Sequence, residues 1–178
     1  MRTLSVNSTF LLIIDVQSRL MPSIEDAGSV LTETKRLHDI ATALEIPVLL
    51  TEQNSKGLGE TVPELITDAN NVVIQKMTFD ACRTPGFIEQ LPDRSDVIVV
   101  GAEAHVCVLQ TVLGLMDNGF HVCVARDALG SRRAENKEAA IRRMERHGAE
   151  IMTVEMIGFE LLTSAEHPHF DEVLHLIK

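Results

Sequence analysis

Six short runs of apolar residues recur along the chain at fairly regular intervals. In five of the runs the apolar residues follow one another without a polar residue between them, and in the sixth a single Thr153 interrupts them. Such continuity is typical of strands that are buried on both faces, as in a parallel sheet, because a strand exposed on one face alternates. The pattern therefore predicts strands at Phe10–Ile14, Pro47–Leu50, Val72–Ile74, Val97–Val100, Val122–Ala125 and Ile151–Val154.

Between the predicted strands, apolar residues recur with the period of a helix. The spacing i, i+3, i+4, i+7 is met by Leu109, Val112, Leu113 and Met116. Asn118-Gly119 is expected to end this helix. A second helix carries Ile141 and Met144, and we expect it to begin at a Ser131 cap and to end near Gly148.

Strands that alternate with helices through short connections predict an α/β fold with three layers, α/β/α, and right-handed crossovers. At 178 residues, 45% of them hydrophobic, the chain is expected to form a single domain over residues 1–178. Ligands of such sheets bind beyond the carboxyl ends of the strands, where the strand order reverses. Candidate chemistry is therefore sought at the ends of the predicted strands.

The charge and the cysteines narrow the class of partner and the compartment. A formal net charge of −10 argues against a nucleic acid or an anionic membrane as partner, since both require clustered Lys and Arg. No apolar run approaches the ~20 residues of a membrane span, and the N-terminal segment lacks the features of a signal peptide. Three cysteines without a CxxC pair suit a reducing compartment, so we expect a cytoplasmic protein with a small-molecule substrate.

Three reactive side chains follow predicted strands. Asp15 comes directly after "FLLII", Lys76 ends "VVIQK", and Cys107 lies where the fourth strand passes into a helix. Taken singly, Asp15 is better interpreted as a cap and Lys76 as a surface residue whose stem packs on apolar neighbours. Together they place a carboxylate, an ammonium group and a thiol at one edge of the sheet.

These three groups suit nucleophilic acyl chemistry. The thiolate is the nucleophile, and a helix N-terminus and a nearby lysine both favour it. A neighbouring carboxylate can accept the thiol proton and return it to a leaving amine. Backbone N–H groups of the turn before Cys107 can hold the oxyanion that forms.

Four segments, in order, carry a resemblance to a known family. They read "LLIIDVQ", "KMTFDAC", "VVGAEAHVCVLQT" and "ARDALGSR", and a further segment reads "TEQNSKGLGETVPEL". With these motifs the chain resembles the isochorismatase-like cysteine hydrolases, which include nicotinamidases and N-carbamoyl amidases. It is most similar to the small isochorismatase-domain proteins, and the resemblance covers almost the whole chain.

The resemblance implies a six-stranded parallel sheet with helices on both faces, a Rossmann-like arrangement, and a homo-oligomer. It places the family's triad on Asp15 as acid and base, Lys76 as cationic partner and Cys107 as nucleophile. It further implies a non-proline cis peptide at Ala102–Glu103, which turns the backbone N–H groups of Glu103 and Cys107 toward the oxyanion.

One segment departs from the nicotinamidase pattern. Those enzymes carry an Asp-x-His metal site after the second strand, where this chain reads "LLTEQNSKGLG". The seven histidines show no ligand spacing, and His167 and His169 are interpreted as a surface turn. We therefore expect no metal and no cofactor, and nicotinamide is not favoured as the substrate.

Residues that flank the motifs complete the candidate site. Gln17, Gln53, Phe79 and His105 are expected near the substrate pocket. Three of them have an alternative role, since Gln17 can hydrogen-bond the backbone locally, Phe79 can equally be core, and His105 can support the site without contacting substrate. Cys82 and Cys123 are interpreted as small buried hydrophobes. Asp127 is expected to be structural, holding the loop before Ser131.

The combined prediction is a hydrolase that acts on a C–N bond other than a peptide bond, through a thioester on Cys107. Its substrate would be a small amide, a carbamoyl compound or a related acyl compound. Two alternatives stay open. One is an isochorismatase-type vinyl ether hydrolase, which does not need the thiol. The other is a non-hydrolytic redox or assembly protein that retains the fold.

Overall fold

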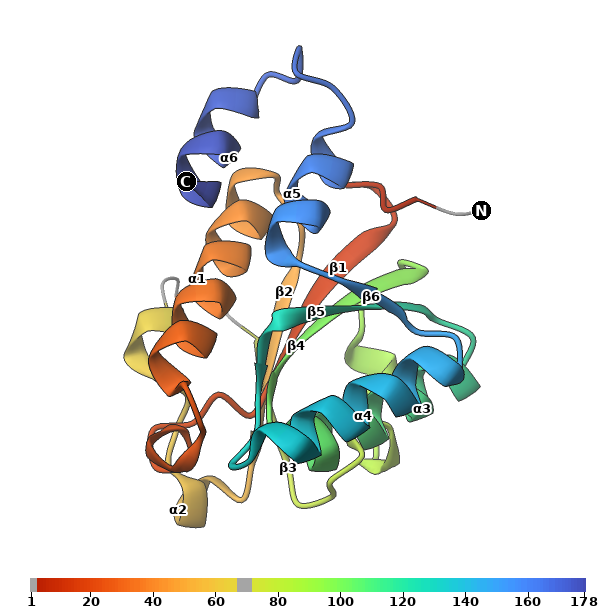
Figure 1. Ribbon diagram of the computed structural model, residues 1–178. Coiled ribbons are helices and arrows are strands. Elements are labelled where there is room, and N and C mark those ends of the chain that lie inside the picture. Colours follow the sequence, from red (N-terminus) through yellow and green to blue (C-terminus); the bar gives the residue numbers. More distant parts are fainter. Residues whose placement is uncertain (1–2, 67–71) are drawn as a thin grey trace.

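Six parallel strands form one sheet in the order β3-β2-β1-β4-β5-β6 (Figure 1). The computed structural model describes residues 3–66 and 72–178. All six predicted strands are present, and the predicted parallel sheet is confirmed. The strands are β1 (Thr9–Ile14), β2 (Val48–Gln53), β3 (Val72–Lys76), β4 (Asp96–Ala102), β5 (His121–Gly130) and β6 (Glu150–Met152).

Helices cover both faces of the sheet, which confirms the three-layer α/β/α class (Figure 1). One face packs against α1 and α5, with α6 packed on these two helices, and the other face packs against α3 and α4. The α-helices are α1 (Ala27–Ala43), α2 (Ser55–Leu58), α3 (Leu109–Asp117), α4 (Ala134–Arg146), α5 (Val154–Leu162) and α6 (Phe170–Ile177). Shorter helical turns are η1 (Met21–Ser23), η2 (Pro63–Leu65), η3 (Ala81–Arg83), η4 (Ile88–Gln90) and η5 (Ala104–Val108), the last of which has π geometry.

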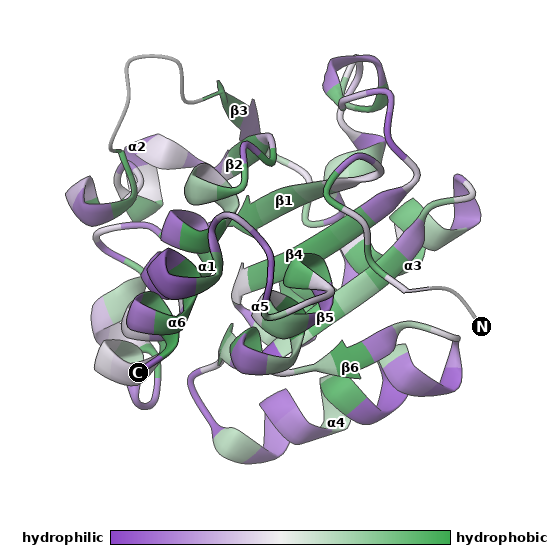
Figure 2. Cartoon of the chain, turned by 90° about the horizontal axis from the view of Figure 1, so that it is seen from above, coloured by the Kyte–Doolittle hydropathy of each residue, from purple (hydrophilic) through white to green (hydrophobic). Residues whose placement is uncertain are grey.

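The continuous apolar runs are explained by burial on both faces. In β1 all six residues are buried, and successive side chains enter opposite cores because strand residues alternate. Leu11 and Ile13 pack toward α1, whereas Phe10, Leu12 and Ile14 pack toward α3. Figure 2 shows the same division as hydrophobic strands enclosed by helices whose outer faces are hydrophilic.

Two predicted boundaries are wrong, and tertiary contacts explain both. Helix α4 begins at Ala134, not at a Ser131 cap, because the Ser131 hydroxyl lies 3.1 Å from Nδ1 of His105. The carboxylate of Glu25 instead accepts the Ala134 N–H at 2.6 Å. The sixth strand ends at Met152, not at Val154 as predicted. Val154 is instead the first residue of α5, and its N–H donates to the carboxylate of Asp127. Asp127 is therefore structural, as expected.

The C-terminal helices are mainly core elements. Helices α5 and α6 pack against α1 and against each other. On α5, Met156 and Phe159 stay exposed. Among residues 3–66 and 72–178, no helix combines the length and the apolar character that crossing a bilayer requires.

The strand order reverses between β1 and β4, which are neighbours at the centre of the sheet. From β1 the chain builds outward to β2 and β3, and from β4 it builds outward to β5 and β6. The connections that follow β1 and β4 therefore diverge, and a crevice opens beyond their carboxyl ends. Asp15 follows β1 and Cys107 follows β4 at this point.

Candidate active site

A buried ion pair lies at the carboxyl end of the central strands. Nζ of Lys76, the last residue of β3, donates to Oδ2 of Asp15 at 2.7 Å, and both side chains are at most 1% exposed. Oδ1 of Asp15 accepts a second hydrogen bond, 2.6 Å long, from the Thr51 hydroxyl on β2. Nζ of Lys76 also donates to the carbonyl of Thr78 at 3.2 Å. The Asp15 carboxylate is thus held by side chains from β2 and β3.

The backbone around Asp15 is tightly constrained. Asp15 has a φ of 51°, in the left-handed region that most residues avoid. Gly101 on β4 pairs with Ile14 and has a φ of 125°, and a Cβ at Gly101 would lie 2.0 Å from the Ile14 carbonyl oxygen. Only glycine permits this approach of the two backbones. The contact brings Asp15 beside the segment that carries Cys107.

Cys107 lies in η5, directly after an unusual turn. The peptide bond between Ala102 and Glu103 is cis, at the position that the family resemblance implies. The Glu103 carbonyl accepts the N–H groups of Val106 and Val108, at 3.0 and 3.2 Å. The chain then continues without a break into α3. Cys107 is therefore held in the first turn of a helical segment, with its side chain 7% exposed.

The pKa of the Cys107 thiol is raised to about 12. Burial is the largest cause, and the negative charge of Asp15 adds to it, while Lys76 acts in the opposite direction. From the sequence, Lys76 and the helix terminus are expected to favour the thiolate. That expectation is wrong for the net result, because burial and Asp15 outweigh the ammonium group. At neutral pH the free protein carries a protonated thiol.

A cavity of about 290 Å³ opens above these groups. Its lining combines apolar side chains with two arginines, and consists of Asp15, Arg19, Leu20, Ser23, Gln53, Leu58, Phe79, Glu103, Val106, Cys107 and Arg132. A larger hollow of about 570 Å³ borders Lys76 from the β3 side, but neither Asp15 nor Cys107 lines it. The smaller cavity is the candidate active site because it contains both the thiol and the carboxylate.

Two of the expected pocket residues line this cavity and two do not. Gln53 and Phe79 are part of the lining, as predicted. Gln17 follows its alternative role, because its amide is fully buried and hydrogen-bonds the backbone of Gln53 and Gly59. His105 also lies outside the lining; its ring nitrogens face Ser131 and Asn136. Gln17 therefore ties the loop after β1 to the end of β2.

Neither cavity arginine is among the site residues predicted from the sequence. Nε of Arg132 contacts Oε1 of Glu103 at 2.7 Å, and Arg19 donates to the Lys56 carbonyl at 3.0 Å. A signal was available, since Arg19 follows the first strand by a few residues and Arg132 ends the segment "ARDALGSR". Both follow strand ends, where ligands of such sheets bind.

The cavity is poorly suited to a metal ion. Its two carboxylates are already paired, Asp15 with Lys76 and Glu103 with Arg132. No histidine occurs among its described lining residues. The arrangement instead offers a nucleophile next to a base, in a confined and partly apolar space.

Comparisons with known proteins find similar sequences and similar folds. A model of the isochorismatase domain matches residues 9–156. A structure described as MAR1 ribonuclease from Caenorhabditis elegans is 36% identical, with a TM-score of 0.94, covering 99% of this chain and 92% of that one. Isochorismatase domain-containing protein 2 of Xenopus laevis is 36% identical over 177 residues, covering 98% of this chain and 85% of that protein. Some curated relatives are longer, and this chain spans 59% of them.

A further solved structure is described as YcaC from Pseudomonas aeruginosa with hexane-2,5-diol and covalent acrylamide. It is 26% identical, with a TM-score of 0.92, and covers 98% of this chain and 91% of that one.

Proposed function

The chain belongs to the isochorismatase family, and we propose that it is a cysteine hydrolase that cleaves a small amide, carbamoyl or related acyl compound. One observation carries the proposal. The Cys107 thiol shares a cavity with the Asp15 carboxylate, which is paired with Lys76 at 2.7 Å. A nucleophile beside a base that a third group holds in place is the pattern of nucleophilic catalysis.

The first step begins from a protonated thiol. Because the pKa of Cys107 is raised to about 12, few molecules carry a thiolate in advance. Asp15 therefore accepts the thiol proton as sulfur attacks the substrate carbonyl. A carbon–sulfur bond forms and the carbonyl electron pair moves to oxygen. Lys76 keeps Asp15 in position and offsets negative charge around the sulfur.

The oxyanion is stabilised by backbone N–H groups in this proposal. Those of Glu103 and Cys107 belong to the turn that contains the cis peptide at Ala102–Glu103. When the oxyanion collapses, the carbon–nitrogen bond breaks and Asp15 returns its proton to the leaving nitrogen. The thioester is then hydrolysed by a water that Asp15 deprotonates, which releases the acid and restores the thiol.

The cavity supports a small substrate. A volume of about 290 Å³ is at the low end of the range for small-molecule sites. Leu20, Leu58 and Val106 favour an apolar portion, whereas Arg19 and Arg132 favour a neutral or anionic substrate over a cation. The net charge of −10 disfavours a polynucleotide, although the C. elegans relative is described as a ribonuclease.

The covalent acrylamide in the P. aeruginosa relative supports a reactive nucleophile in this fold. Two wider proposals accompany the chemistry. Exposed apolar side chains on α5, Met156 and Phe159, support a homo-oligomer. Three free cysteines support a reducing compartment, the cytoplasm.

The test is a screen of small amides and carbamoyl compounds for release of ammonia or acid. Wild type is compared with Cys107→Ser, Asp15→Asn and, as matched control, Cys82→Ser, whose thiol lies outside the cavity lining. We expect Cys107→Ser and Asp15→Asn to lose turnover and Cys82→Ser to retain it. Turnover by Cys107→Ser equal to that of wild type would refute the assignment of Cys107 as the nucleophile. If wild type and Cys107→Ser both cleaved a vinyl ether, isochorismatase-type hydrolysis would replace the proposed amide hydrolysis.

A further inference from the structure

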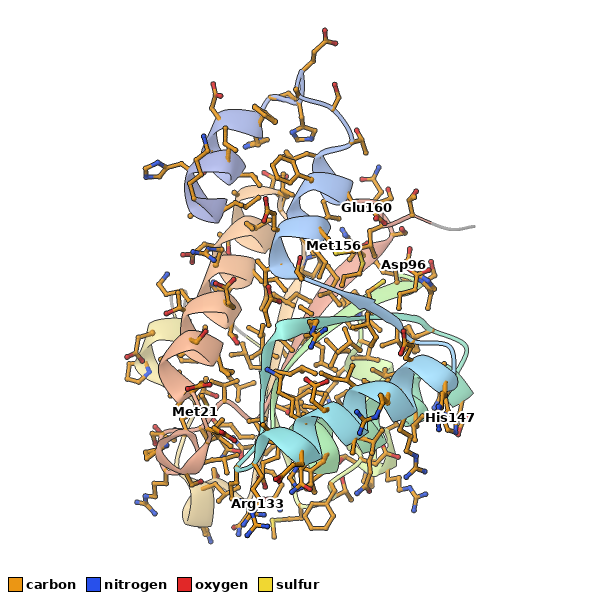
Figure 3. The ribbon with its side chains drawn as sticks, in the orientation of Figure 1. Met21, Asp96, Arg133, His147, Met156 and Glu160 are labelled. Atoms are coloured by element: carbon orange, nitrogen blue, oxygen red, sulfur yellow. The ribbon has the colours of Figure 1, made fainter. Side chains whose placement is uncertain are left out.

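A second group of chemically reactive side chains lies at the opposite, amino end of the sheet. Asp96 begins β4, His121 begins β5 and Glu150 begins β6. Asp96 pairs in register with His121, and Cys123 pairs with Glu150. Residues two apart in a strand share a face, so the four side chains form a staggered row across β4, β5 and β6 on one face of the sheet. In Figure 3, Asp96 lies on the right of the view, well above Met21 and Arg133 in its lower part.

The distances within this group match a metal site. Nε2 of His121 lies 3.4 Å from Oε1 of Glu150, and Sγ of Cys123 lies 3.8 Å from Oε2 of Glu150. All three ligand atoms lie within 4.8 Å of one another. A tetrahedral zinc site has metal–ligand distances of about 2.0–2.3 Å, which places its ligand atoms about 3.3–3.8 Å apart. Only a small closure is needed to bring three ligands around an ion.

Asp96 fixes the histidine in the orientation that such a site needs. Its Oδ1 lies 3.1 Å from Nδ1 of His121, and its side chain is 1% exposed. A metal-binding histidine commonly gives its second ring N–H to a carboxylate, which fixes the tautomer and leaves the other nitrogen for the metal. In His121 that other nitrogen is Nε2, the one that faces Glu150.

The surroundings carry an excess of negative charge. Besides Glu150 itself, the carboxylates of Asp96 and Glu160 act electrostatically on the Cys123 side chain. Glu160, on α5, accepts the Leu4 N–H at 2.7 Å. A bound cation would offset the repulsion among these carboxylates.

We propose that His121 Nε2, Cys123 Sγ and a Glu150 oxygen bind one divalent transition metal ion, with Asp96 as the positioning residue. A thiol and an imidazole favour Zn²⁺ over Mg²⁺ or Ca²⁺. Binding forms the zinc–sulfur bond and releases the thiol proton to solvent. Glu150 has a side chain 45% exposed, which gives the ion a route of entry and leaves a fourth position for water. The ion would join the amino ends of β5 and β6.

This proposal departs from the prediction that the protein holds no metal. The ligands come from two strands, and Glu150 is distant in sequence from the His121-x-Cys123 pair, so no ligand spacing reveals them. The site is also independent of the proposed hydrolase chemistry, because Asp15 and Cys107 lie beyond the other ends of the strands.

The test uses the full chain, freed of metal with a chelator and titrated with Co²⁺. We expect one Co²⁺ per chain and an absorption band for charge transfer from thiolate to cobalt. Zn²⁺ should displace the Co²⁺ and raise the thermal unfolding temperature. Glu150→Gln changes a half-exposed side chain and should fold normally while weakening zinc binding by at least about tenfold. Cys123→Ser should remove the charge-transfer band, and Asp96→Asn should weaken affinity by about 10–100-fold.

Cys107→Ser and Cys82→Ser are the matched controls, and both should keep the band. The proposal is overturned if wild type binds no Co²⁺ or Zn²⁺. It is equally overturned if the band survives in Cys123→Ser or disappears in Cys107→Ser, since the ion would then be at another thiol. A Glu150→Gln protein that binds zinc as tightly as wild type would exclude Glu150 as a ligand. None of these results depends on hydrolase activity.

Discussion

Replacing Asp15 by Asn should change two reactions of Cys107 in opposite directions. Asp15 opposes the thiolate in the free protein, because its charge and its hydrogen bond both raise the pKa of Cys107. The same carboxylate is the base that the proposed reaction requires. Asp15→Asn should therefore speed alkylation of the thiol and slow hydrolysis of the substrate. A substitution that only damaged the site would slow both.

The size of the effect follows from the thiolate population. With a pKa of about 12, about one Cys107 in ten thousand is a thiolate at pH 8. An ordinary thiol, with a pKa of about 8.5, is about one quarter thiolate at that pH. Each unit by which the pKa falls raises the alkylation rate about tenfold, equivalent to about 1.4 kcal/mol. Loss of the base should lower turnover by about 10²–10⁴-fold.

The assay follows iodoacetamide labelling of the Cys107 peptide by mass spectrometry across the neutral and alkaline range. The wild-type rate should keep rising well above the pH at which an unfolded control saturates. The Asp15→Asn profile should be shifted to lower pH by at least about one unit, a tenfold rate change. A wild-type midpoint near that of an ordinary thiol would refute the effect of burial. Slower labelling of Asp15→Asn would refute the electrostatic reasoning, provided that thermal unfolding shows the variant to be folded.

Three further predictions concern the scaffold around the site. Lys76→Met leaves the buried carboxylate of Asp15 without its cationic partner and should lower the free energy of unfolding by about 3–5 kcal/mol, measured by urea denaturation. The double variant Asp15→Leu/Lys76→Met should recover most of this loss. No recovery would argue against the pairing. Gly101→Ala should destabilise the protein by more than about 3 kcal/mol, because the new Cβ meets the backbone of β1 at 2.0 Å. The control Gly119→Ala, also at positive φ but with nothing within 4 Å, should cost about 1–2 kcal/mol, and equal losses would contradict the steric reasoning. Gln17→Leu removes hydrogen bonds to buried backbone and should lower the free energy of unfolding by about 2–4 kcal/mol in urea denaturation. The free-energy equivalent of its change in KM should be smaller than this loss. A larger effect on KM than on unfolding would indicate that Gln17 contacts the substrate.

Sequence pattern alone was sufficient for the architecture. The apolar runs are continuous because both faces of each strand are buried, so the strands and the three layers could be predicted from local composition. Asp15 directly follows β1 and Cys107 closely follows β4, and their placement at one edge follows from the parallel direction of the strands. Gln53 and Phe79 were expected at the same edge for the same reason, and both line the cavity.

Contacts between distant segments decided the rest. The sequence left a pocket role open for Gln17. In the fold, its amide hydrogen-bonds the backbone carbonyls of Gln53 and Gly59, which lie far from it along the chain. Ser131 looked like a helix cap, but His105 contacts its hydroxyl. A local pattern shows which groups a residue offers, whereas the assembled chain determines which partners reach them.

The charge state of the thiol shows this division most clearly. From the sequence, a lysine and a helix terminus favour a thiolate at Cys107. In the fold, burial and the adjacent Asp15 raise its pKa to about 12. The sequence by itself determined the strands, the edge of the sheet and the identity of the reactive groups, because these depend on local periodicity and side-chain chemistry. Only the tertiary structure decided the pairing of Asp15 with Lys76 and the protonation of Cys107. It also brought together His121, Cys123 and Glu150. These features depend on burial and on distances between segments that are remote in sequence, and these two factors control electrostatic energy.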